Sequence, residues 1–129
     1  MKFKKNATIP VGTIVYKKVA VVHRLTVDTV VLTCVVTKPG FCPGVDEDRK
    51  CRVAQVIPIS AENIVWDSRR AKRKYLPITD EKTVFSSIHK PSFRYKLYRK
   101  ATTRLNTDKT KVCASGIHVF LTKRCARNY

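Results

Sequence analysis

Short runs of β-branched and aromatic residues, each bounded by turn residues, are the feature that most constrains the fold of this chain. Residues 30–36 read V-V-L-T-C-V-V and residues 93–98 read F-R-Y-K-L-Y; residues 13–20 and 51–59 follow the same rule. Such runs are typical of strands, and no stretch has the longer periodicity of an amphipathic helix. We therefore predict a mostly-β or α+β fold, a compact single domain of about five strands with a short C-terminal helix.

The C-terminal stretch predicts a turn, a strand and that helix in succession. Gly116 suits a turn because it adopts positive φ at no steric cost. Residues 117–121, I-H-V-F-L, predict a buried strand, and Thr122 offers an N-cap hydroxyl for a helix over residues 123–129. Spacing predicts that Cys125, Ala126 and Tyr129 form the inner face of this helix.

Three other features predict breaks between strands. Residues 39–44 hold two Pro and two Gly, which is typical of a loop. Pro58 indicates the end of a strand or an edge strand, because it has no N–H to donate. Residues 60–66 fit a single helical turn with Ser60 as its cap.

The length of 129 residues predicts one domain, which we divide into a basic N-terminal arm over residues 1–7 and a globular domain over residues 8–129. No apolar run approaches the roughly 18 residues that span a bilayer. No apolar segment of signal-peptide character follows the basic N-terminus, so we expect folding in a cytosol-like compartment.

Five cysteines, an odd count, favour reduced and mostly buried thiols, so we expect no disulfide. The spacing of Cys113, His118 and Cys125 lacks the close pairs of structural zinc sites, so we expect no metal and no cofactor. A nucleophilic pair of Cys113 and His118 would need an orienting group, and none is marked in the sequence. We expect His118 to form a hydrogen bond that ties its strand to a neighbouring loop.

The net charge of +18 is unevenly spread, with a net of +5 in residues 1–64 and +13 in residues 65–129. Such a chain is attracted to polyanions or to acidic protein surfaces. Alternation directs Tyr95 inward between Arg94 and Lys96, so that only Tyr98 shares the basic face. The candidate residues for binding a partner or phosphate are Arg69, Arg70, Lys72, Arg73, Lys74, Arg94, Lys96, Arg99, Lys100 and Arg104.

Three stretches carry a resemblance. Residues 113–129, C-A-S-G-I-H-V-F-L-T-K-R-C-A-R-N-Y, residues 15–19, V-Y-K-K-V, and residues 49–54, R-K-C-R-V-A, resemble a small domain of unknown function. That domain occurs in phages and large DNA viruses and in proteins with pentapeptide repeats. The resemblance covers most of the chain and implies a viral origin, without an assigned chemistry. Its structural motif falls on Cys51, Cys113, Gly116, His118 and Phe120.

No motif for nucleotide hydrolysis, dinucleotide binding or hydrolytic catalysis is present, so we expect a protein that is not an enzyme. The first hypothesis is a small basic virion component, a minor capsid or cementing protein of a large DNA virus that docks on acidic surfaces of other capsid subunits. It would be made in the host cytoplasm, with nuclear import an option for the basic block, and would not span a membrane. The alternative is a nucleic-acid-binding protein that neutralises phosphates without reading sequence.

Overall fold

The computed structural model describes residues 7–22, 27–42, 51–62, 64–67, 70–75, 82–105 and 116–129. Within these ranges the chain is mostly strand and ends in one short helix, which confirms the predicted fold class. Ten strands are described instead of about five, because several of them are only two to four residues long. The strands are β1 (Ala7–Ile9), β2 (Ile14–Val22), β3 (Val27–Cys42), β4 (Cys51–Ala61), β5 (Ile64–Asp67), β6 (Lys72–Tyr75), β7 (Phe85–Ser87), β8 (Arg94–Tyr95), β9 (Ala101–Thr102) and β10 (Ile117–Val119), followed by the helix α1 (Lys123–Arg127).

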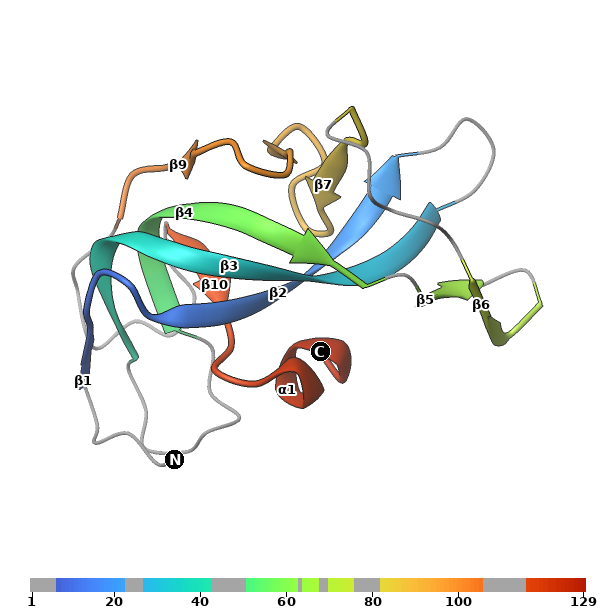
Figure 1. Cartoon of the computed structure of the whole chain (residues 1–129), viewed down its shortest axis with the longest axis horizontal. Helices are drawn as coiled ribbons and strands as arrows, with labels where there is room; N and C mark the ends of the chain where they lie inside the picture. The colour runs from blue at the N-terminus through green and yellow to red at the C-terminus, as the bar shows by residue number, and fades with distance from the viewer. Residues whose placement is uncertain are drawn as a thin grey trace.

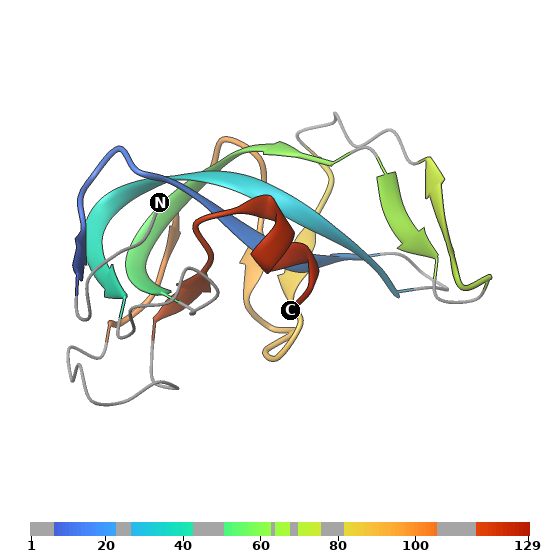
Figure 2. The ribbon, with the colours of Figure 1, turned by 90° about the horizontal axis from the view of Figure 1, so that it is seen from below.

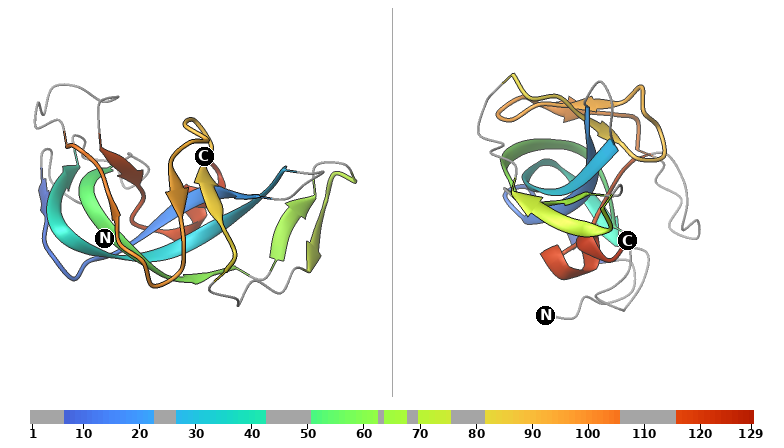
Figure 3. Two further views of the ribbon diagram at one scale, coloured as in Figure 1. Left: turned by 90° about the horizontal axis from the view of Figure 1, so that it is seen from above. Right: turned by 90° about the vertical axis from the view of Figure 1, so that its right-hand side faces the viewer.

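The described strands form one antiparallel sheet, in which β3 is central, as its β-branched run predicts. The main strand order is β10-β4-β3-β2-β7-β8, and β3 also pairs with β1 and β5. The sheet is strongly curled, which is clearest when the molecule is viewed along its long axis (Figure 3). Beyond β10, Phe120 forms an antiparallel bridge with Tyr16 of β2. This bridge joins the two sides of the curled sheet, so that β2, β3, β4 and β10 enclose an interior.

The main core fills that interior. Val15 and Val19 of β2, Leu32 and Cys34 of β3 and Val53 of β4 are all 0% exposed and belong to one cluster. A smaller cluster lies on the outer face of the sheet, where Ala126 of α1 packs with Val31 and Phe120. Figure 2 shows α1 crossing this outer face, and Figure 1 shows β7 and β9 on the opposite side of β2–β4.

The C-terminal elements agree with the sequence in kind, with corrections in detail. Gly116 has a φ of 147°, as the predicted turn requires. The strand ends at Val119 instead of residue 121, and Leu121 is only partly buried. Thr122 caps α1, since its Oγ1 accepts a hydrogen bond from the Cys125 N–H at 3.1 Å. Ala126 is buried as predicted, but Tyr129 is 49% exposed, because the helix ends before it.

Two predicted loop or helix segments are strands. The Pro and Gly content of residues 39–44 predicted a loop, but residues 39–42 continue β3. Gly40 is needed there, since a Cβ on it would lie 2.0 Å from the Arg52 oxygen. The predicted helical turn over residues 60–66 is also wrong, because Ser60 and Ala61 extend β4 and residues 64–67 form β5.

Pro58 lies inside β4 and not at its end. The pairing of β3 with β4 shifts register next to it, from Cys34 opposite Pro58 to Thr33 opposite Ser60. A bulge of this kind is one of the places where a sheet tolerates proline.

The predicted strand over residues 93–98 is paired only at Arg94–Tyr95. Its alternation is nevertheless confirmed, because Tyr95 and Leu97 are 3% and 4% exposed while Arg94 and Lys96 are exposed. Tyr98 is 60% exposed, as predicted for the one aromatic residue on the basic face.

The prediction of no disulfide is wrong. Cys42 and Cys51 form a disulfide bond between the end of β3 and the start of β4. The neighbouring cross-strand pair is Phe41 opposite Arg52, so the sheet register places the two cysteines opposite each other. Cys34 and Cys125 keep their thiols, and Cys113 lies outside the described residues.

Candidate basic surface and pocket

The predicted basic residues separate into two groups. The hairpin group consists of Arg70, Lys72 and Arg73, all exposed, on the β5–β6 hairpin. Arg69 and the side chain of Lys74 lie outside what the structure describes. The β8–β9 group consists of Arg94, Lys96, Arg99, Lys100 and Arg104, which are also exposed. The hairpin projects from one end of the molecule, while β9 lies over the other half of the sheet (Figure 1). The structure therefore does not bring the eight predicted side chains that it describes into one patch.

The acidic side chain that the structure describes is engaged outside these two groups. Among the side chains that the structure describes, Glu62 is the only carboxylate. Its Oε2 accepts a hydrogen bond from Arg127 of α1, and its Oε1 accepts one from the Val31 N–H at 3.1 Å. Glu62 is thus committed to holding the helix against β3, and it lies in neither basic group.

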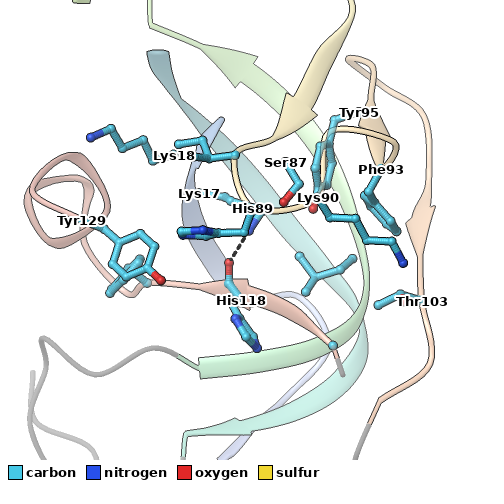
Figure 4. A pocket seen from close by; sticks show the side chains of 14 residues that line it. Lys17, Lys18, Ser87, His89, Lys90, Phe93, Tyr95, Thr103, His118 and Tyr129 are labelled. Carbon is cyan, nitrogen blue, oxygen red and sulfur yellow. Dashed lines mark hydrogen bonds between the residues drawn. The ribbon is translucent and has the colours of Figure 1, made fainter. Parts of the chain in front are cut away.

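A pocket lies where one edge of β2 changes its partner. Tyr16 and Phe120 exchange two backbone hydrogen bonds of 2.8 Å each, and Val19 pairs with Ser87 of β7. Lys17 and Lys18 fall between these two pairings, where β10 and β7 diverge. Side chains from both strands, from the β7–β8 turn and from the end of α1 line the space between them, which has a volume of about 270 Å³ (Figure 4).

Lys17 occupies an interior position of β2. Its neighbours on the same face, Val15 and Val19, are both 0% exposed, while Lys17 is half-buried. Its Nζ donates a hydrogen bond of 2.9 Å to the backbone oxygen of His118. Figure 4 shows this bond at the side of the pocket, with the imidazole of His118 directed away from Lys17. His118 thereby ties β10 to β2 through its carbonyl, and the predicted hydrogen bond to a neighbouring loop stays a prediction.

Groups next to Lys17 stay uncharged at neutral pH. Burial raises the pKa of the Cys34 thiol to about 12, and the charge of Lys17 acts in the opposite direction. Burial, and secondarily Cys34, also raise the pKa of Tyr95, which lines the pocket. The ammonium of Lys17 therefore lies near a neutral thiol, and the pocket that it borders is also lined by a neutral phenol.

The remaining lining is basic and aromatic. Lys18 and Lys90 contribute positive charges and His89 contributes an imidazole, and the described residues that line the pocket include no Asp or Glu side chain. The His89 and Tyr129 rings meet edge to face with centroids 5.7 Å apart, and the Phe93 and Tyr95 rings lie 5.0 Å apart. This combination can hold an anion next to a flat ring.

Sequence reasoning missed this pocket, because its residues come from five separate segments. One signal was present: Lys17 interrupts the apolar alternation of Val15 and Val19. A cation at a strand position that faces the interior indicates either a buried ion pair or a ligand-binding site.

The residues of the structural motif lie around β4 and β10. Cys51 forms the disulfide, Gly116 makes the turn and Phe120 closes the sheet onto β2. Beneath Gly116, Arg52 is 0% exposed, and its guanidinium lies 4.7 Å from the centroid of the Phe41 ring. Within the described ranges, no three His, Cys, Asp or Glu side chains come together as metal ligands. The one helix seen there is too short to cross a membrane.

No family model and no solved structure matches this chain. A curated protein of Acanthamoeba polyphaga mimivirus, itself uncharacterised, is 44% identical over 50 residues, which cover 39% of this chain. The match spans about a third of the length of that relative, 32%. The chain is therefore similar, over part of its length, to a protein of a large DNA virus.

Proposed function

We propose that this protein is a non-enzymatic virion component of a large DNA virus, a small minor capsid or cementing protein that docks on acidic surfaces of other capsid subunits. The partial similarity to a mimivirus protein supports the viral origin. We extend the proposal to membership of the phage and large-virus domain that the C-terminal motif resembles. The disulfide between Cys42 and Cys51 suits a particle, because disulfides persist in oxidising surroundings, which include virion surfaces.

The separation of the two basic groups carries this proposal. A protein that cements two neighbours needs two docking surfaces, and the hairpin group and the β8–β9 group lie over different parts of the molecule (Figure 1). Complementary charge steers such docking and fixes its register. Because each group has three or more exposed cations, each provides an electrostatic surface of its own.

Quantitative mass spectrometry of particles of the encoding virus tests the proposal. Two tagged triple variants are compared, Arg70, Lys72 and Arg73 to Gln, and Lys96, Arg99 and Lys100 to Gln. We expect each variant to fold, as judged by circular dichroism, and each to be depleted from particles. A third variant, Lys38, Lys123 and Arg124 to Gln, removes the same charge from exposed sites outside both groups and should be incorporated normally.

Absence of the wild-type chain from purified particles would exclude the virion role. Normal incorporation of both triple variants would exclude docking through the two groups.

A sequence-nonspecific nucleic-acid-binding protein is the second candidate. The observation that favours it is the pocket, where lysines lie beside aromatic rings, since single strands bind through phosphate contacts and base stacking. Each phosphate contact contributes a salt slope of about −0.7 on a single strand, so a variant with Lys17, Lys18 and Lys90 changed to Gln would flatten the slope by up to about 2.1. Nanomolar affinity for nucleic acid at physiological salt would place this candidate first.

A further inference from the structure

We propose that the pocket between β2, β7 and β10 binds a nucleotide, with Lys17 and Lys90 at its phosphate and His89 and Tyr129 at its base. This inference goes beyond the virion role, because it assigns a small-ligand site that particle docking does not require.

Two lysines from different elements, Lys17 and Lys90, supply the cations for the phosphate. Lys17 reaches the pocket from β2, and the hydrogen bond of its Nζ to the His118 oxygen holds the ammonium in place. Lys90 lies in the turn between β7 and β8 and is exposed, and its side chain extends toward Phe93 and Thr103, on the side of the pocket opposite Tyr129 (Figure 4). Lysine is a common phosphate ligand, and the described lining holds no Asp or Glu side chain that would repel a phosphate.

The base half of the site is built from rings. Tyr129 is half-exposed, and its ring contacts both His89 and Phe120, with centroids 5.7 and 5.3 Å apart. Phe93 packs on the buried Tyr95 on the other side of the pocket. Nucleobases stack on such side chains regardless of sequence, because every base has a π-face.

The size of the pocket limits the ligand to one nucleotide. Its volume of about 270 Å³ lies just under the usual range of about 300–1,000 Å³ for ligand pockets. One base with one phosphate fits this space better than a dinucleotide cofactor. The nucleotide could be free or could be the end of a single nucleic-acid strand, since both present the same chemistry.

Amide chemical shifts of the full-length protein test the inference at physiological salt, about 0.15 M. The probes are deoxyadenosine monophosphate, deoxyadenosine and inorganic phosphate. We expect the nucleotide to shift residues 17–18, 87–90 and 116–118, and to bind at least about tenfold more tightly than either fragment, because one hydrogen bond to a charged group accounts for that factor. Equal binding of inorganic phosphate, or shifts confined to the β5–β6 hairpin, would overturn the proposal.

Two variants locate the phosphate contact. Lys90→Gln should weaken nucleotide binding about tenfold, whereas Lys100→Gln, an equally exposed lysine outside the pocket, should leave it unchanged. Lys17→Met keeps most of the apolar stem, removes the ammonium and should cause a loss at least as large. If Lys17→Met fails to fold, Lys90→Gln alone decides, and equal affinity of Lys90→Gln and Lys100→Gln would overturn the assignment.

A tetranucleotide with and without a 5′-phosphate distinguishes a strand end from a free nucleotide as the ligand. Tighter binding of the phosphorylated strand than of the mononucleotide, with shifts at the same residues, supports the site and identifies a strand end. Tighter binding of the mononucleotide supports the site and identifies the free nucleotide.

Discussion

Lys17 and Arg52 are cations in places that an apolar side chain could fill. Removing a charge from water costs several kcal/mol, so each must be held by specific contacts. Lys17 is held by the His118 oxygen, and Arg52 lies over the Phe41 ring. A desolvated cation–π contact contributes about 2 kcal/mol toward the cost of burying Arg52. Lys17 lies beside the pocket and Arg52 lies beneath Gly116.

Cys34 makes the stability of the folded protein depend on pH in the alkaline range. Burial raises the pKa of its thiol from 9.0 to about 12, so the folded chain keeps a proton that the unfolded chain loses above pH 9.0. The stability contributed by the neutral thiol is full below pH 9.0 and is lost as pH rises towards 12. We expect the free energy of unfolding in urea to fall there by up to about 1.4 kcal/mol per pH unit for this one proton.

The contribution of Cys34 is isolated by substitution, because the pKa of Tyr95 is also raised by burial. Above pH 9.0, the free energy of unfolding of Cys34→Ala should fall less steeply with pH than that of the wild type. The difference should correspond to about one proton. Cys125→Ala, a change of the same chemistry at a partly exposed site, serves as the control. Equal slopes for the two variants would count against the assignment.

The hairpin of β3 and β4 is the element on which the fold depends most. It is long, with 16 and 11 residues in its two strands, and both strands take part in the interior. Gly40 lets the two backbones approach closely near its end, and the Cys42–Cys51 bond joins that end covalently. Because β10 pairs with Cys51, Arg52 and Val53, the same end positions the C-terminal strand.

Removing the disulfide should therefore destabilise the protein. The bridge closes a loop with a sequence separation of 9, for which chain entropy gives about 2–3 kcal/mol. We expect the double variant Cys42→Ser, Cys51→Ser to lose about this much free energy of unfolding in urea. Thiol titration of the denatured wild type should find two more thiols after reduction than before. An unchanged thiol count would refute the bridge.

The charge of +18 affects the whole molecule. Like charges repel one another more in the compact state than in the extended chain, so the charge opposes folding. Within the described side chains, the single carboxylate, Glu62, relieves little of this repulsion.

Salt should accordingly stabilise this protein. Raising sodium chloride from about 20 to about 200 mM shortens the Debye length from about 20 to about 7 Å, which screens charges across the surface. We expect Tm, measured by calorimetry, to rise by a few degrees over this range. The triple Gln variants carry less charge and should show a smaller rise. A Tm that is flat or falls with salt would show that self-repulsion is unimportant.

The sequence by itself determined the features that depend on neighbouring residues. The β-branched run of residues 30–36 predicted the central strand, and the Tyr95 and Leu97 alternation predicted which side chains are buried. Gly116 and Thr122 predicted the turn and the cap, because positive φ and a capping hydroxyl are local requirements. These predictions need no knowledge of the partner strands.

Tertiary structure decided everything that depends on which strands meet. The sequence did not predict that residues 39–42 continue β3, because pairing with β4 outweighs the turn propensity of Pro39 and Gly40. It did not predict the disulfide, because only the register of β3 on β4 sets Cys42 opposite Cys51. The pocket exists because β2 changes partner between Tyr16 and Val19, and the separation of the basic groups follows from where β6 and β9 lie. Hydrogen bonds between strands join residues far apart in the chain, so their register is not a property of any local stretch.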